Sequence, residues 1–115
     1  MNAFQDRGDL RLLHRLLPKI VGTIYYAEPG SPLEVVAEAC YERLLIVRQQ
    51  LVRDLEDEYG ECSVASMRPP ESQRALLRDL IKAVRHTIMH AGATGALISE
   101  LQAIHVKLLA VQEVL

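Results

Sequence analysis

One short segment of the sequence combines residue types that can carry out acid–base chemistry beside a bound anion. Arg85 is followed by the polar residue His86 and, five positions after the arginine, by His90. Arginine stays charged and presents a planar fork of donors to phosphate oxygens, whereas histidine gives or takes a proton near neutral pH. Together, these residue types favour chemistry at a phosphate group.

The pattern from Arg85 to His90 resembles the Arg-polar-x-x-x-His signature of HEPN domains, which are helical modules of about this length. That family includes many prokaryotic toxin and defence ribonucleases, and its motif lies near the junction that leads into the final helix. The segment lies at that place here. One HEPN subgroup has a tyrosine two residues after the histidine, but Gly92 occupies that position in this chain.

The resemblance implies an endoribonuclease that needs neither metal nor cofactor. His90 would transfer protons, Arg85 would bind the phosphate, and His86 would orient them or bind substrate. The resemblance also implies a homodimer with a composite site at its interface, and the toxin families add an antidote protein as a partner. We expect RNA to be the substrate.

The helical position of the motif leaves a second interpretation open. Residues five apart on an unbroken helix lie roughly 140° apart, so Arg85 and His90 share a side only if Gly92 loosens the last turn. Otherwise Arg85 is simply solvated and His90 caps or fills the end of the helix, where the helix dipole favours an imidazolium.

A row of basic residues precedes the motif on the same helix. Four cations fall within an arc of roughly 80°, opposite much of the apolar side. They are Arg74, Arg78, Lys82 and Arg85. We expect the first three to bind substrate by guiding an RNA backbone toward the motif, although an ordinary solvated helix surface would have the same pattern.

The histidine spacing also bears on metal binding. His86 and His90 are four residues apart, which can place two imidazoles on one metal, but no acidic or cysteine ligand lies beside them. We therefore predict no metal site. His14 and His105 are interpreted as packing or surface histidines.

The composition favours an all-α fold. Of the 115 residues, 50% are hydrophobic and only 4% are aromatic, so the core must consist of aliphatic side chains that suit helix packing. The net charge of -2 excludes the strong basic excess that accompanies broad nucleic-acid binding. Charged residues near the start exclude a signal peptide, and the chain has no uncharged run of ~20 residues that could span a membrane. With Cys40 and Cys62 interpreted as reduced thiols, we expect a cytoplasmic protein.

Four amphipathic segments are expected to position the motif. The first helix starts near Asp6 or Asp9, kinks or restarts at Pro18, and ends at residues 28–30. The second is capped by Ser31 and Glu34 and runs to about Tyr59 and Gly60.

Residues 61–69 are expected to form a loop, after which Pro70 opens the third helix. Residues 91–95 interrupt the pattern, and Thr94 caps a fourth helix that runs to Leu115. With short connections, these segments predict one domain over residues 1–115, a compact antiparallel four-helix bundle.

The final segment suggests a different class of function. Val106, Val111, Val114 and Leu115 add apolar positions beyond one narrow stripe. Such a broad apolar surface on the last helix has two interpretations. Either it contacts another chain, most simply in a homodimer, or the helix has a wide arc that faces the core of its own bundle. The alternative to a HEPN-like protein is therefore a non-catalytic helical adaptor, chaperone or complex subunit that binds a protein partner through an apolar helix surface.

Overall fold

The computed structural model describes residues 3–55, 69–91 and 95–115 and has four helices there. They are α1 (Ala3–Tyr26), α2 (Pro32–Leu55), α3 (Gln73–His90) and α4 (Ala96–Val114). No strand occurs in these ranges. The expectation of an all-α fold is confirmed.

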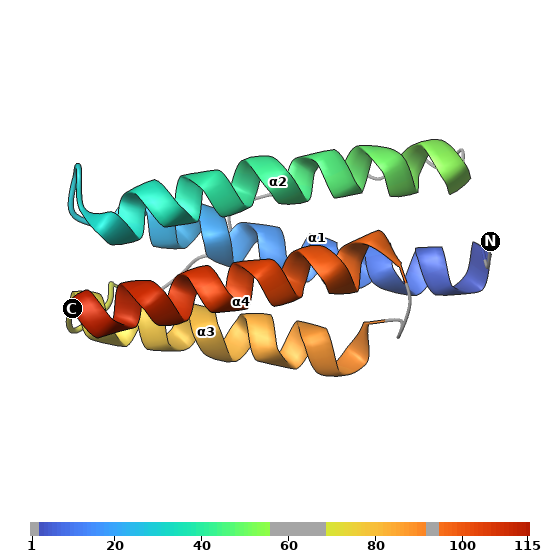
Figure 1. The fold of residues 1–115 in the computed structure, drawn as a ribbon. Helices are drawn as coiled ribbons and strands as arrows, with labels where there is room; N and C mark the ends of the chain where they lie inside the picture. Colours follow the sequence, from blue (N-terminus) through green and yellow to red (C-terminus); the bar gives the residue numbers. More distant parts are fainter. Residues whose placement is uncertain (1–2, 56–68, 92–94) are drawn as a thin grey trace.

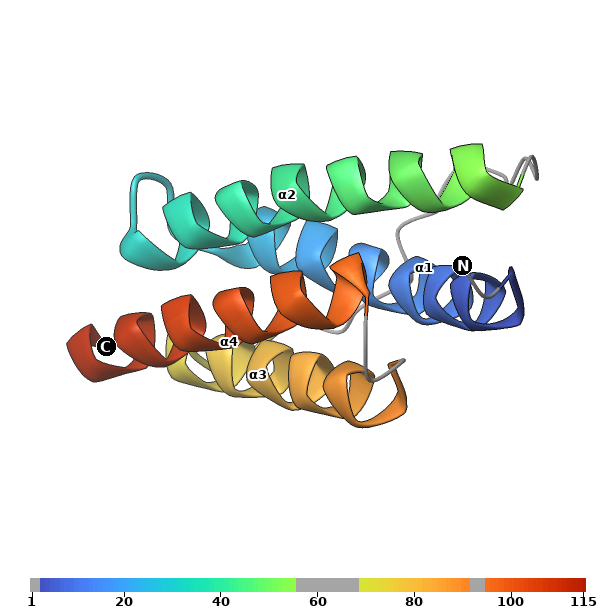
Figure 2. The ribbon, with the colours of Figure 1, turned by 45° about the vertical axis from the view of Figure 1, so that its right-hand side comes forward.

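The helices form a four-cornered bundle whose neighbours are all antiparallel (Figure 1). α1 and α4 run in one direction, and α2 and α3 run in the other. α1 packs on α2 and α3, and α4 packs on the same two helices, which leaves the parallel pairs on the diagonals (Figure 2). This confirms the antiparallel bundle. The end of α2 and the start of α3 lie at opposite ends of the bundle, so these two helices are not consecutive antiparallel neighbours.

The core is aliphatic and receives side chains from every helix. Its largest fully buried members are leucines and isoleucines: Leu10, Leu13, Leu16, Leu17, Ile20, Leu33, Leu44, Leu76, Leu77, Leu97, Leu101 and Ile104. Each leucine or isoleucine of this kind contributes roughly 1.5–3 kcal/mol by leaving water. Burial along one stripe of each helix therefore holds the four helices together. None of the helices in the described ranges is long and apolar enough to cross a membrane.

The turn between α1 and α2 has the expected capping arrangement. The Ser31 hydroxyl accepts a hydrogen bond from the backbone N–H of Glu34 at 3.2 Å, which caps α2. The Glu34 carboxylate reaches back to the N–H of Gly30 at 2.9 Å, one residue earlier than in the usual capping box. Gly30 has a φ of 77°, a conformation that glycine adopts at no steric cost.

The other helix boundaries differ in detail from the sequence pattern. α1 continues through Pro18 as one helix, so it does not restart there. Ser72, not Pro70, begins α3, because its hydroxyl accepts a hydrogen bond from the N–H of Ala75 at 3.0 Å. Gly95 occupies the N-cap of α4 with a φ of 148°. The expected cap Thr94 and the expected helix end at 59–60 lie outside the described residues.

Candidate nucleic-acid interface

The last turn of α3 remains regular up to His90. The N–H of Ala91 donates to the carbonyl of Thr87 at 2.9 Å, and the Thr87 hydroxyl donates to the carbonyl of Ala83 at 2.8 Å. The helix therefore does not loosen before Ala91, and Arg85 and His90 keep the roughly 140° separation of an α-helix. Within one chain, the two principal residues of the motif project from different sides of α3.

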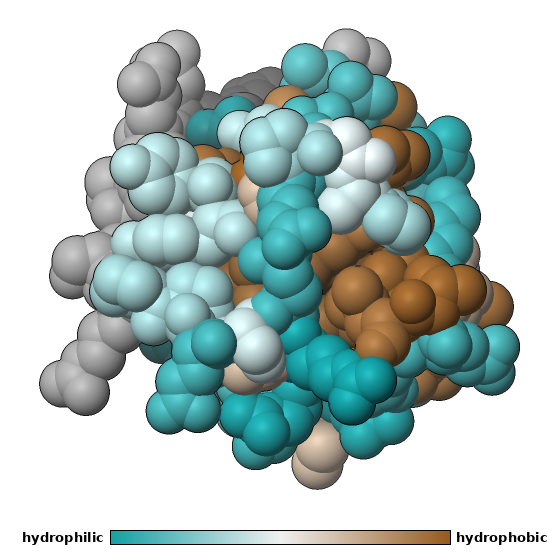
Figure 3. Space-filling view, turned by 90° about the vertical axis from the view of Figure 1, so that its left-hand side faces the viewer, coloured by the Kyte–Doolittle hydropathy of each residue, from teal (hydrophilic) through white to brown (hydrophobic). Residues whose placement is uncertain are grey.

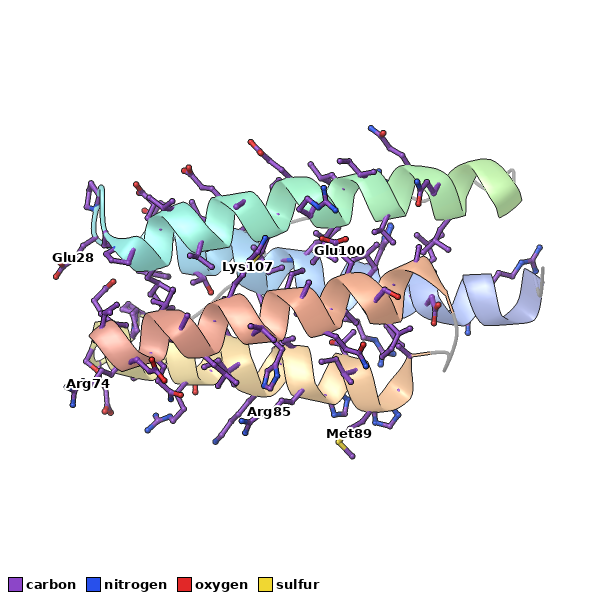
Figure 4. The ribbon with its side chains drawn as sticks, viewed as in Figure 1. Glu28, Arg74, Arg85, Met89, Glu100 and Lys107 are labelled. Atoms are coloured by element: carbon purple, nitrogen blue, oxygen red, sulfur yellow. The ribbon has the colours of Figure 1, made fainter. Side chains whose placement is uncertain are left out.

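Arg85 contacts α4 rather than His90. Its Nε donates a hydrogen bond to Nε2 of His105 at 3.0 Å, at an exposed position between the two helices. Figure 4 shows Arg85 and Met89 on the side of α3 that faces away from α2. Because Arg85 and His105 are 20 residues apart, the sequence spacing gave no signal for this arginine–histidine pair.

The two histidines of the motif lie together on the other flank of α3. The ring centroids of His86 and His90 are 4.4 Å apart, with 54° between the ring planes, and both residues are exposed. His86 lies next to α1, where it lines a small pocket. In the described ranges, no group of three or more His, Cys, Asp or Glu residues is placed to hold a metal ion.

The three expected substrate-binding residues are all exposed along α3. Arg74 lies at the end of the bundle where α4 finishes, and its Nε donates to the backbone oxygen of Leu115 at 2.7 Å. Arg78 approaches the carboxylate of its neighbour Asp79 at 3.8 Å. A cavity of about 380 Å³ beside these arginines is lined by both of them. Lys82 continues the row toward Arg85.

α1 adds basic residues that the residue spacing on α3 does not indicate. α1 and α3 together contain eight Lys or Arg residues against three Asp residues, of which Asp9 is buried. The cations are Arg7, Arg11, Arg15, Lys19, Arg74, Arg78, Lys82 and Arg85. By contrast, α2 and α4 together contain four Lys or Arg residues and six Asp or Glu residues. We refer to the exposed cations of α1 and α3, with His86 and His90, as the basic surface.

A pocket lies between α1 and α3 on this surface. Its volume is about 130 Å³, several times the ~30 Å³ that one water occupies in the liquid. Arg15 and Lys19 of α1 and His86 of α3 line it. The pocket therefore brings one member of the sequence motif together with two cations from a distant part of the chain.

The side of the bundle formed by α2 and α4 is different. Arg43 of α2 donates two hydrogen bonds to the Glu100 carboxylate of α4, at 2.9 and 3.3 Å. The carboxylate raises the pKa of the Arg43 guanidinium, mainly through the hydrogen bond. Glu100 and Lys107 both lie on the side of α4 next to α2 (Figure 4).

Several large apolar side chains are exposed on α2 and α4. Val35 and Ile46 of α2 are 59% and 50% exposed, and Val106 and Val114 of α4 are 66% and 68% exposed. Viewed from the end of the bundle where α4 finishes, hydrophobic side chains gather on one part of the surface beside hydrophilic ones (Figure 3). The exposed side chains of α2 and α4 that we refer to as the apolar surface are Val35, Ile46, Val106 and Val114.

Comparison with known proteins assigns no relative to this chain. No protein-family model matches it, and neither the curated proteins nor the solved structures contain a significant match.

Proposed function

We propose that this protein binds RNA through the basic surface of α1 and α3. The observation that supports this proposal is the segregation of charge, because cations gather on two adjacent helices of a chain whose net charge is -2. The side chains of Arg11, Arg15, Lys19 and Lys82 have no hydrogen bond or ion pair with any residue in the described ranges. A phosphate backbone would neutralise these charges and release its counterions.

The HEPN-like motif extends this proposal from binding to cleavage. Because Arg85 and His90 project from different sides of α3, the composite site would combine Arg85 of one copy with His90 of a second copy. Arg85 would stabilise the charge on phosphorus, His90 would transfer the proton, and His86 would hold the substrate. The protein would then be a cytoplasmic, metal-independent endoribonuclease of the toxin or defence type, held in check by an antidote partner.

A cleavage assay with labelled RNA in the presence of a chelator tests this function. We expect the native protein to cut RNA and both Arg85→Ala and His90→Ala to lose the activity. Lys107→Ala is the matched control, because it removes an exposed cation from the opposite side of the bundle. RNA that binds but stays intact would reduce the proposal to binding, and RNA that neither binds nor is cut would overturn it.

Mixing the two inactive variants tests the composite site. If each site takes Arg85 from one copy and His90 from the other, a heterodimer of Arg85→Ala and His90→Ala retains one complete site. Activity should therefore return to roughly a quarter of the native level when equal amounts exchange subunits, since half of the dimers are mixed and each has one site of two. No recovery, with subunit exchange verified, would overturn the composite site.

The apolar surface favours a second candidate function. Four large apolar residues exposed on α2 and α4 would suit a protein partner, so the chain would act as an adaptor or complex subunit. Replacing Val106 and Val114 by serine distinguishes the two functions. If the chain is an adaptor, the double substitution abolishes binding of its protein partner, and neither the native protein nor the variant binds RNA. If the basic surface binds RNA, the native protein and the variant bind it equally well.

A further inference from the structure

The pocket between α1 and α3 has the chemistry of a site for a single phosphate group. We propose that it binds the terminal phosphate monoester of an RNA strand, an inference that rests on RNA binding by the basic surface. Arg15, Lys19 and His86 line the pocket, and no acidic residue does. Guanidinium, ammonium and imidazole groups all donate hydrogen bonds to phosphate oxygens.

Arg15 and Lys19 of α1 lie close enough for their like charges to destabilise the helix slightly. Arg15 and Lys19 are four residues apart, so their side chains project from the same side of α1. Like charges at this spacing repel each other, and neither side chain has a hydrogen bond or ion pair with a residue in the described ranges. A dianion between them would relieve the repulsion and satisfy both donors.

The third donor comes from α3, so the site depends on the fold. His86 lies across the pocket on the helix that packs against α1, and its ring is held beside that of His90 at 4.4 Å between centroids. The remaining lining residues include the apolar Leu12, Leu16 and Ala83. The pocket thus has hydrogen-bond donors beside an apolar lining. Because the apolar lining cannot bind a second charged group, the pocket favours one compact anion over an extended polyanion.

The size and charge of the pocket favour a strand end over a backbone phosphate. A phosphate monoester carries a charge of about −1.5 to −2 at neutral pH and has three free oxygens. A phosphodiester has one charge and is flanked by a nucleoside on each side. Three donors around a cavity of about 130 Å³ match the monoester, and Arg11 and Lys82 on the same surface are available for the nucleotides that follow.

Binding of an internally labelled RNA oligonucleotide tests the proposal. The same sequence is prepared with a 5′-phosphate, with a 3′-phosphate, and with hydroxyls at both ends. We expect one phosphorylated form to bind about tenfold more tightly than the hydroxyl form, as an added charge-assisted contact predicts. The preferred end identifies the source of the phosphate, and millimolar inorganic phosphate should abolish the preference.

The variants separate the pocket from general attraction of RNA. Arg15→Gln with Lys19→Gln should remove the preference for the phosphorylated end, whereas Arg11→Gln should weaken all three oligonucleotides equally and keep the preference. Circular dichroism verifies that each variant is folded. Equal binding of the three oligonucleotides, or a preference that survives the double substitution, would overturn the pocket but not RNA binding. If no oligonucleotide binds, both proposals fail.

Discussion

The basic surface and the side formed by α2 and α4 rest on one core but use charge in opposite ways. Across α2 and α4, Arg43 and Glu100 form an ion pair that connects neighbouring helices. On α1 and α3, Arg15, Lys19 and Lys82 have no such partner in the described ranges. The first arrangement is satisfied within the bundle, and we propose that bound RNA satisfies the second.

This difference separates charges that help folding from charges that do not. An exposed ion pair stabilises a fold only slightly, but it does not oppose folding. The side chains of Arg15, Lys19 and Lys82 add repulsion to the folded state and make no hydrogen bond or ion pair within the described ranges that would offset it. The positions of these charges, which the bundle brings together, therefore support the proposal that the basic surface is a binding surface.

The largest expected effect comes from the core that both surfaces share. Leu101 of α4 is fully buried, and Leu101→Ala should cost about 2–5 kcal/mol, a large part of the ~5–15 kcal/mol that stabilises a domain. Urea denaturation measures the loss, and RNA binding should fall with it. Val106→Ala on the same helix is the control, since Val106 is 66% exposed and should change stability little. A loss below about 1 kcal/mol for Leu101→Ala would show that α4 is not part of this core.

The thiol of Cys40 should be protected by the seam between α2 and α4. Burial of this thiol is the main reason that its pKa is raised from 9.0 to about 11. The charge of Lys107 lowers the pKa and the charge of Glu100 raises it, each by less than burial does. The native protein should then hold about a hundredth of the usual thiolate, and thiolate is the form that reacts. Labelling with a thiol reagent in a Cys62→Ser background measures this, with the urea-unfolded protein as control. Equal rates in the two states would contradict the burial.

A matched pair of charge reversals tests the contrast between the two sides directly. Lys19 and Lys107 are both exposed lysines, one on the basic surface and one beside α2. Lys19→Glu should weaken RNA binding about tenfold at low salt and reduce the slope of log K against log salt by ~0.7 for each lost contact with single-stranded RNA. Lys107→Glu should change neither quantity beyond the small effect of net charge. Equal losses would mean that RNA senses only total charge.

Much of the fold could be predicted from the sequence because it follows from local patterns. The spacing of apolar residues gave four helices, and Ser31 with Glu34 correctly marked the start of α2. Pro70 was a misleading signal, because Ser72 offers the hydroxyl that caps α3. The direction of α3 relative to α2 depends on packing, which no local pattern records.

The candidate site was less predictable because its contacts join distant parts of the chain. The sequence placed Arg85 with His90, but the fold places Arg85 with His105 and places His86 beside Arg15 and Lys19. A net charge of -2 also concealed the basic surface, since α2, α4 and the segments between the helices carry a net negative charge that offsets it in the sum. Only the row of basic residues from Arg74 to Arg85 could be predicted, because helical spacing within α3 is enough to place these residues on one side.

The smallest expected effect concerns the seam where the two sides meet, between α1 and α2. Nε of Arg48 donates a hydrogen bond to Nε2 of His14 at 3.1 Å, which requires that nitrogen to be unprotonated. Burial and the charge of Arg48 lower the pKa of His14 below its ordinary value of 6.5. The unfolded chain therefore takes up this proton at a higher pH than the folded protein does.

It follows that the stability contributed by this contact is present above about pH 6.5 and declines as the pH falls toward the lowered pKa of folded His14. Thermal unfolding between pH 7 and roughly pH 5, above the range where most carboxylates titrate, should show a small decline in Tm. His14→Gln keeps an acceptor for Arg48 without titrating, so its Tm should fall less over the same window. An identical decline in both proteins would mean that the α1–α2 seam does not respond to pH, and the proton-linked change would then have to arise on one of the two surfaces themselves.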